Sequence, residues 1–116
     1  MEMLTRNFSR DEMACPCCGA CDMTSEFMTR LQTFRDLLRV PVAIASGFRC
    51  EAHNREVGGS PESMHLTGQA ADPVIIPEQR HRMIELAYKL EFSGVGLGKS
   101  KFHLDTGPVR QRSWGY

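Results

Sequence analysis

Residues 63–72 read Ser63-Met64-His65-Leu66-Thr67-Gly68-Gln69-Ala70-Ala71-Asp72, and across them the chain passes from a loop into a candidate strand. His65 and Asp72 stand seven positions apart, and Gly68 between them allows a sharp turn. Side chains alternate across a strand, so Ala70 and Asp72 share a face, and the small Ala70 leaves room beside an ion. Because zinc accepts both imidazole and carboxylate ligands, the pair is a candidate metal site, although its spacing alone does not choose the metal.

A further candidate ligand lies about thirty residues later, in the segment Phe102-His103-Leu104-Asp105. In a strand, His103 and Asp105 share one face, while the two apolar residues beside them pack into the core. His65, Asp72 and His103 together make three protein ligands, and three ligands leave a fourth position for water in a hydrolytic zinc site. Asp105 could then reach that water or orient a neighbouring group.

Apolar periodicity around these segments predicts a small α+β fold. Ser9 and Glu12 have the spacing of a capping box, which predicts a short helical turn. Helices are expected at 24–39, at 51–57 and after Pro77, and strands at 42–46, 70–76 and 102–105, the first of them buried. Pro73 indicates an edge or irregular strand position, and residues 94–98 are expected to form a turn. We therefore expect one domain over residues 1–116, with helices packed on a short, mainly antiparallel sheet that carries the metal site.

Composition narrows the class of protein. The chain has 116 residues, with 14 Lys+Arg and 14 Asp+Glu, so its formal net charge is zero. A neutral chain argues against a general nucleic-acid binder, whose surface is normally basic. No apolar run approaches the ~20 residues of a membrane span, and residues 1–10 lack the apolar core of a secretory signal. We expect a monomer that is cytoplasmic as synthesised.

Several motifs together resemble one family. Ser63-x-His65-x-x-Gly68-x-Ala70-x-Asp72, followed by His103-x-Asp105, resembles the zinc D-alanyl-D-alanine metallopeptidases. The closer match is a compact branch that is common in phages and bacteria and is often a C-terminal domain. Other segments agree in the same order: Phe8–Met13, Ser46–Arg49, Ala52–Asn54 with Gly58-Gly59, and His103–Pro108 with Trp114–Tyr116. The resemblance therefore covers nearly the whole chain.

The resemblance implies roles for five residues. It implies that His65, Asp72 and His103 bind one Zn²⁺, and that Arg49 and Ser63 help to bind the substrate. The implied substrates are cell-wall peptides, some ending in a D-Ala carboxylate that a guanidinium can clamp in bidentate fashion. Each substrate-binding role has a structural alternative, which is an ion pair with a loop carboxylate for Arg49 and a loop cap for Ser63.

The general base departs from the family pattern. Many members carry an acidic residue three positions before the last zinc histidine, and Ser100 occupies that position here. Asp105 is the catalytic candidate, because it shares the face of His103 and a carboxylate beside a metal-bound water can take its proton. The alternative is that Asp105 orients a zinc-binding imidazole. Glu62 and Glu91 are weaker candidates for the base.

Five cysteines are unusual in a chain of this length. Cys15, Cys17, Cys18 and Cys21 fall within seven positions, and Cys50 stands apart. Structural zinc sites usually take their ligands from two separated pairs, so four ligands from this run alone would be cramped. Adding Cys50 allows a split site or a disulfide, whereas a reducing compartment favours free thiols. The sequence leaves all three states open.

The leading hypothesis is a zinc peptidase that hydrolyses peptidoglycan peptides through a metal-activated water. It would act as a D-Ala-D-Ala carboxypeptidase or as an endopeptidase on a cross-link or stem bond. Ser100 motivates an alternative, a non-catalytic zinc-binding recognition module of the same fold, and the cysteines motivate a thiol-based metal or redox protein. A protein made in the cytoplasm would reach the wall after lysis, export or particle assembly, which is consistent with a phage or prophage lysis role.

Overall fold

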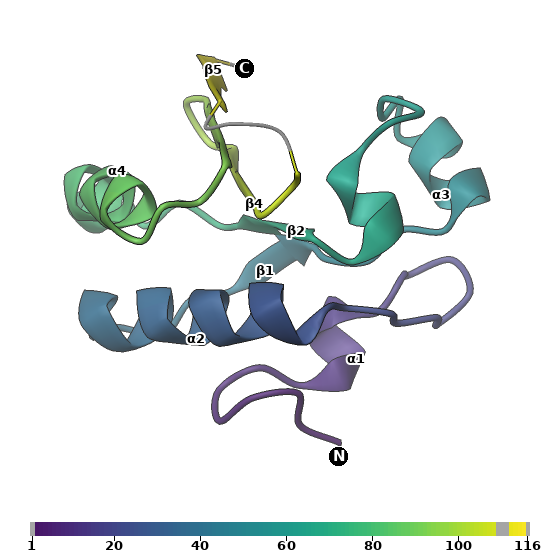
Figure 1. Ribbon diagram of the computed structural model, residues 1–116, viewed down its shortest axis with the longest axis horizontal. Helices are drawn as coiled ribbons and strands as arrows, with labels where there is room; N and C mark the ends of the chain where they lie inside the picture. Colours follow the sequence, from purple (N-terminus) through teal and green to yellow (C-terminus); the bar gives the residue numbers. More distant parts are fainter. Residues whose placement is uncertain (1, 109–111, 116) are drawn as a thin grey trace.

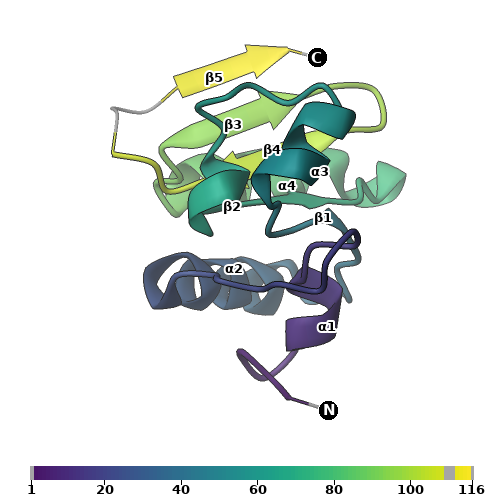
Figure 2. The same cartoon turned by 90° about the vertical axis from the view of Figure 1, so that its right-hand side faces the viewer.

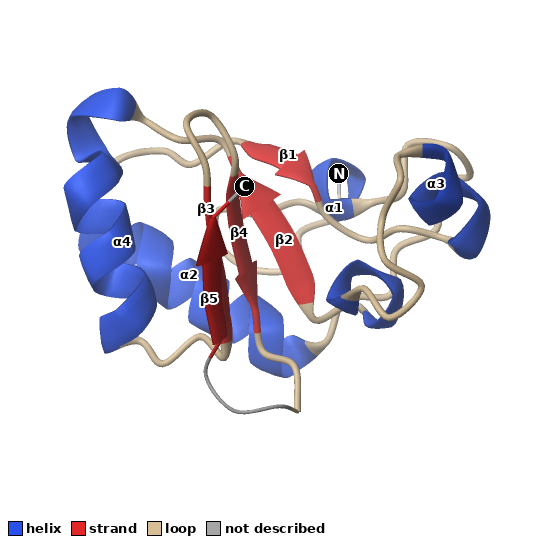
Figure 3. Ribbon diagram, turned by 90° about the horizontal axis from the view of Figure 1, so that it is seen from above, coloured by secondary structure: helices blue, strands red, loops and turns tan. Residues whose placement is uncertain are grey.

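The strands of the computed structural model, which describes residues 2–108 and 112–115, form one sheet in the order β1-β2-β4-β3-β5. The strands are β1 (Ile44–Ser46), β2 (Ala70–Pro73), β3 (Gly94–Leu97), β4 (Phe102–Asp105) and β5 (Arg112–Gly115). Neighbours are antiparallel except for β3 and β5, which run parallel. The strands that carry Asp72 and His103, β2 and β4, therefore lie side by side within the sheet (Figure 3).

Most of the helices begin after a residue whose side chain accepts a hydrogen bond from a backbone N–H of the first turn. The helices are α1 (Arg10–Met13), α2 (Ser25–Leu38), α3 (Glu51–Glu56) and α4 (Arg80–Lys89), with short 3₁₀ turns η1 (Met64–Thr67) and η2 (Pro77–Gln79). Ser9 and Glu12 form the predicted capping box before α1. Thr24 caps α2 by accepting a hydrogen bond from the Phe27 N–H at 3.2 Å. No helix in the described ranges is long and apolar enough to cross a membrane.

The core lies between the sheet and the two longer helices. α2 runs beneath the sheet and α4 lies to one side, at the opposite end of the molecule from α3 (Figures 1 and 2). The ring of Phe92 meets those of Phe27 and Phe34 edge-on, with centroids 6.1 and 6.2 Å apart. Phe102 of β4 stacks on Phe34 at 6.4 Å, so the apolar face of β4 packs on α2. The other face of β4 is left for His103 and Asp105, as the alternation predicts.

The α+β class is as expected from the sequence, but several details differ. Residues 94–97 form strand β3 and not the predicted turn. β1 is not buried, because Ala45 is exposed and its neighbours are half-buried. The irregularity predicted at Pro73 is confirmed by a register shift between β1 and β2, whereas the edge position is wrong, since β2 lies between β1 and β4. β5 was not expected, and Tyr116 of the terminal motif lies outside the described residues.

Candidate metal centre

Three segments that are distant in the sequence bring His65, Asp72 and His103 together. His65 lies on η1, Asp72 on β2 and His103 on the adjacent strand β4. Nε2 of His65 lies 3.2 Å from Oδ1 of Asp72, and Nδ1 of His103 lies 2.8 Å from the same oxygen. One nitrogen from each ring and one carboxylate oxygen all lie within 4.8 Å of one another. The three predicted ligands therefore meet at one point.

The outer nitrogen of each imidazole has a hydrogen-bond acceptor. Nδ1 of His65 lies 2.7 Å from the carbonyl oxygen of Gly47, and Nε2 of His103 lies 2.8 Å from Oδ2 of Asp105. An oxygen acceptor favours a proton on the outer nitrogen, and this is the tautomer that each ring adopts when its inner nitrogen binds a metal ion. The inner nitrogens then present lone pairs toward Asp72, where they can take a proton or a metal ion.

This donor set fits zinc. Two imidazole nitrogens and one carboxylate oxygen are ligands that zinc prefers, and such a set of three leaves a fourth position open. Ligand atoms about 2.0–2.1 Å from a tetrahedral zinc lie about 3.3 Å from one another. The separations of 3.2 and 2.8 Å between the nitrogens and Asp72 Oδ1 are close to that value. The two separations from Asp72 are therefore compatible with one zinc ion bound by these residues.

The electrostatics of the site favour a cation. Burial opposes ionisation of Asp72, but hydrogen bonds with His103 and His65 outweigh it and hold the pKa of this carboxyl well below its usual range. Burial also disfavours the charged form of His103, yet its contacts with Asp105 and Asp72 raise the pKa of this imidazole. Asp72 is therefore an ionised carboxylate that attracts positive charge to the centre of the site.

Arg49 contacts the second oxygen of Asp72. Its Nη2 lies 3.3 Å from Asp72 Oδ2, Nε donates to Ser46 Oγ at 3.1 Å, and Nη1 donates to Asn54 Oδ1 at 3.2 Å. Arg49 thus forms an ion pair, but its partner is the predicted metal ligand on strand β2 and not the expected loop carboxylate. The contact leaves Oδ1 of Asp72 directed at both histidines.

The backbone of residues 46–49 links the site to the N-terminal helix. The Arg49 N–H donates to the carbonyl of His65 at 3.1 Å, and the Phe48 N–H donates to the carbonyl of Met13 at 2.8 Å. Gly47 has no room for a side chain, because a Cβ there would lie 2.5 Å from the Met13 carbonyl oxygen. This segment therefore fixes the Gly47 carbonyl against His65 and the Arg49 side chain against Asp72.

Ser63 both caps η1 and faces the pocket. Its Oγ accepts a hydrogen bond from the His65 N–H at 3.2 Å, which is the loop cap given as its alternative role. An open pocket of about 750 Å³ surrounds the site, and all six predicted site residues line it. Ser100 and Glu62 also line this pocket, whereas Glu91 does not.

Asp105 is almost fully enclosed, with a relative exposure of 1%. Besides the contact with His103, its Oδ1 accepts the Gly107 N–H at 3.0 Å and lies 3.4 Å from the Ser93 hydroxyl. Gly94 faces Asp105 across the β3–β4 pair, and a Cβ on Gly94 would clash with this carboxylate. The orientation of Asp105 is therefore set by its contacts on β3, on β4 and in the following turn.

Several residues that build the site were not predicted from the sequence. Asn54 is buried, donates from Nδ2 to the Ser60 carbonyl at 2.8 Å and places its Oδ1 against Arg49. Ser93, just before β3, and Gly94, the first residue of β3, contact Asp105 from the neighbouring chain segment. Asn54 and the Ser46–Arg49 segment belong to motifs that resemble the family, and this resemblance was the only sequence signal that pointed to them. Their contacts join residues from separate segments of the chain, so no local pattern reveals these contacts.

A family model described as Peptidase M15 matches residues 6–105, a range that includes every residue of the metal centre. A search of the curated proteins gave no match. Because the matched range covers most of the chain, we conclude that the chain belongs to the peptidase M15 family, the zinc D-alanyl-D-alanine carboxypeptidase-like metallopeptidases.

Proposed function

We propose that this protein is a zinc peptidase that hydrolyses peptide bonds of peptidoglycan, and that residues 1–116 form a single catalytic domain. The observation that carries the proposal is the convergence of His65, Asp72 and His103 in an open pocket of about 750 Å³. Membership of the peptidase M15 family supports a metallopeptidase, and the donor set supports zinc. The bond attacked is the terminal D-Ala-D-Ala bond or a cross-link or stem bond.

In this proposal, His65, Asp72 and His103 hold the metal from one side and leave the pocket side open to substrate. When bound, zinc lowers the pKa of a water molecule and polarises the scissile carbonyl. The Gly47 carbonyl and Asp105 keep the two imidazoles in the tautomer that presents a lone pair to the metal. Catalysis then depends on groups that are already oriented before the substrate arrives.

Arg49 acts on the metal centre in this proposal. Its three nitrogens are directed to Ser46, Asn54 and Asp72, so the guanidinium positions the carboxylate of a metal ligand. To bind a substrate carboxylate, Arg49 would have to break at least one of these three contacts. Ser63 keeps its proposed place in substrate binding, because it lines the pocket directly beside His65.

Two carboxylates, Asp105 and Glu62, have separate roles in the proposed reaction. The buried Asp105 is within hydrogen-bonding distance of His103, and we assign it the positioning of that ring. The exposed Glu62 lines the pocket, and we assign it proton transfer between water and the leaving amine. The role of Asp105 as general base is the competing assignment, and the two assignments predict different behaviour in the variants described in the Discussion.

The decisive experiment is mass spectrometry of purified muropeptides after incubation with the zinc-loaded protein. Loss of one terminal D-Ala identifies a carboxypeptidase, and conversion of cross-linked dimers to monomers identifies an endopeptidase. Asp72→Asn is the negative control, because it replaces an ionised metal ligand by a neutral amide of the same shape.

The proposal fails if the protein binds zinc at this centre yet cleaves no muropeptide. That result would instead support the non-catalytic recognition module. Binding of muropeptides without cleavage, measured by calorimetry, would then distinguish recognition from an inactive preparation.

A further inference from the structure

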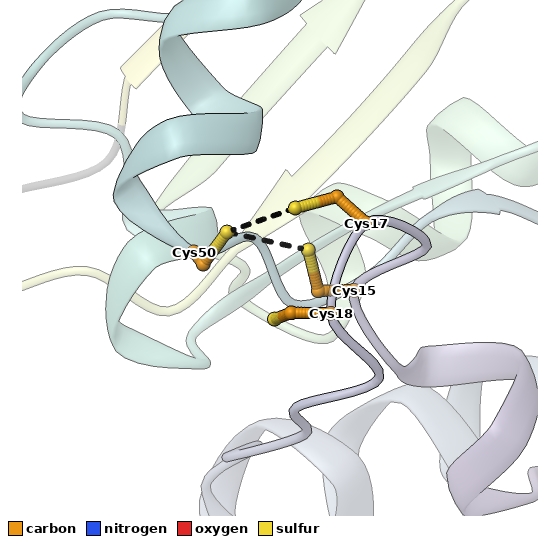
Figure 4. A group of neighbouring side chains, drawn as sticks. All are labelled: Cys15, Cys17, Cys18 and Cys50. Atoms are coloured by element: carbon orange, nitrogen blue, oxygen red, sulfur yellow. Dashed lines mark hydrogen bonds between the residues drawn. The ribbon is translucent and has the colours of Figure 1, made fainter.

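A second cluster of metal-ligating side chains lies outside the pocket, where the N-terminal loop meets the start of α3. It consists of Cys15, Cys17, Cys18 and Cys50, whose Sγ atoms all lie within 4.8 Å of one another. Figure 4 shows three of these side chains on one tight loop and the fourth at the start of the helix, with the sulfurs of Cys15 and Cys17 directed toward that of Cys50. The fifth cysteine, Cys21, does not belong to this group.

The separations of Cys50 from two other sulfurs are close to the edge length of a metal tetrahedron. Sγ of Cys50 lies 3.7 Å from that of Cys15 and 3.4 Å from that of Cys17. With zinc–sulfur bonds of about 2.3 Å, the edge of a tetrahedron of thiolates is about 3.8 Å. A disulfide requires about 2.05 Å between two sulfurs. It would also involve only two cysteines and would not explain why four sulfurs lie together.

The chain path explains how three ligands come from four successive residues. The Cys15 N–H donates to the Ala20 carbonyl and the Gly19 N–H donates to the Cys15 carbonyl, both at 2.8 Å, so the loop folds back on itself. Cys50 follows 35 residues after Cys15 and is the N-cap residue of α3. The loop therefore supplies only three of the four sulfurs, and the fourth comes from a separate segment.

Backbone N–H groups surround the sulfurs. Backbone N–H groups of Cys50, Cys17 and Cys18 are directed at the Cys15 sulfur. The Cys50 sulfur accepts the His53 N–H at 3.4 Å. Such N–H contacts around thiolate ligands are the kind of outer contact that orients and stabilises a metal site.

We propose that Cys15, Cys17, Cys18 and Cys50 bind a second zinc ion, as a closed tetrathiolate site with a structural role. The ion would fasten the N-terminal loop to the residue next to Arg49, whose guanidinium contacts Asp72. The site stands on its own geometry and does not depend on peptidase activity. It replaces the expectation of one zinc ion per chain by two.

The test counts metal and identifies its ligands. Protein purified under reducing conditions is expected to carry two zinc ions per chain by elemental mass spectrometry. Cys17→Ser/Cys18→Ser should carry one, because two ligands are too few for a structural zinc site. Both residues are exposed, so the substitutions leave the core intact. Cys21→Ser is the matched control from the same loop and should retain two ions.

Cobalt substitution of the unaltered chain gives a second readout that no variant's folding can affect. Thiolate ligands produce a sulfur-to-cobalt charge-transfer band, which a site made only of histidine and aspartate lacks. Absence of this band would overturn the proposal, as would equal metal content in the double variant and in Cys21→Ser. A disulfide joining Cys50 to Cys15 or Cys17 in the reduced preparation, detected as a mass loss of two hydrogens, would also overturn it.

Discussion

At the scale of single residues, Arg49 contacts Oδ2 of Asp72 and leaves Oδ1 for the proposed metal ion. Replacing Arg49 by alanine leaves Oδ2 without its cation and frees the carboxylate to rotate. We expect Arg49→Ala to weaken zinc binding at this centre by about 10–100-fold, the usual effect of removing a group that orients a ligand. The measurement is a zinc dissociation constant by chelator competition. Arg55→Ala, an exposed position on α3, is the matched control, and equal affinity in the two variants would contradict the assignment.

Asp105 and Glu62 have separable roles in the proposed reaction. In Asp105→Asn the neutral amide orients His103 less well, so we expect weaker zinc binding together with lower kcat. Glu62→Gln should lower kcat about 10²–10⁴-fold, the typical worth of a general base, with zinc affinity unchanged. Steady-state kinetics and chelator competition on the same preparations provide both readouts. Unchanged zinc affinity in Asp105→Asn, combined with abolished turnover, would assign the base to Asp105 instead.

The proposed metal ligands are easier to predict than the groups that orient them. His65, Asp72 and His103 carry side chains whose chemistry is visible in the sequence. The carbonyl of Gly47 is a backbone atom, and nothing in a sequence marks one carbonyl among many as the partner of His65. Asn54 orients Arg49 from a different element, so that contact exists only after the fold has formed.

At the scale of elements, β3 shows why glycine-rich segments are hard to assign. Gly94 and Gly96 indicate a turn by their conformational freedom, yet they pair with Asp105 and His103 on β4. A side chain on Gly94 would occupy the space of the Asp105 carboxylate. The glycine at position 94 is thus explained by a polar residue on the neighbouring strand. The helices, by contrast, were predictable because their caps and apolar periodicity are local.

The turn between His65 and Asp72 depends on Gly68. Gly68 has φ of +72°, and a Cβ there would clash with the carbonyl oxygen of Asp22. Gly58 has φ of +75°, but a Cβ there would meet nothing within 4 Å, so Gly58→Ala is the matched control. We expect Gly58→Ala to cost about 1–2 kcal/mol, the left-handed backbone alone, and Gly68→Ala to cost more. Urea unfolding measures both free-energy changes. Equal destabilisation in the two variants would show that the loop around Gly68 accommodates the added Cβ without a further loss of stability.

At the scale of the whole molecule, a metal ion held by His65, Asp72 and His103 would couple segments that are far apart in the chain. Zinc that binds only the folded state stabilises it by about 2.7 kcal/mol when its free concentration is 100 times the dissociation constant. We therefore expect a zinc chelator to lower the Tm by several degrees, and added zinc to restore it. The chelator should lower the Tm of Asp72→Asn by less than it lowers the Tm of the unaltered chain, as measured by calorimetry. An identical response would place the stabilising metal elsewhere than at this centre.

Acid should weaken zinc binding to the whole protein. The inner nitrogens of His65 and His103 must be unprotonated to bind metal, and the pKa of His103 is raised in the metal-free protein. Protons therefore compete with zinc as pH falls below that pKa, whereas Asp72, with its lowered pKa, stays ionised. Each displaced proton should reduce the apparent affinity about tenfold per pH unit. Chelator competition across a pH series measures the slope, and a pH-independent affinity would contradict this arrangement of ligands.

The contact between Met13 and residues 47–48 limits how far the N-terminus of this domain can be shortened. A fragment that begins after α1 loses the carbonyl that accepts the Phe48 N–H and opens a gap beside Gly47. The Gly47 carbonyl would then be free to move away from His65. Anyone who grafts this domain onto a targeting module, or trims it to a minimal enzyme, should therefore keep the residues from Phe8 onward and place the new junction before them.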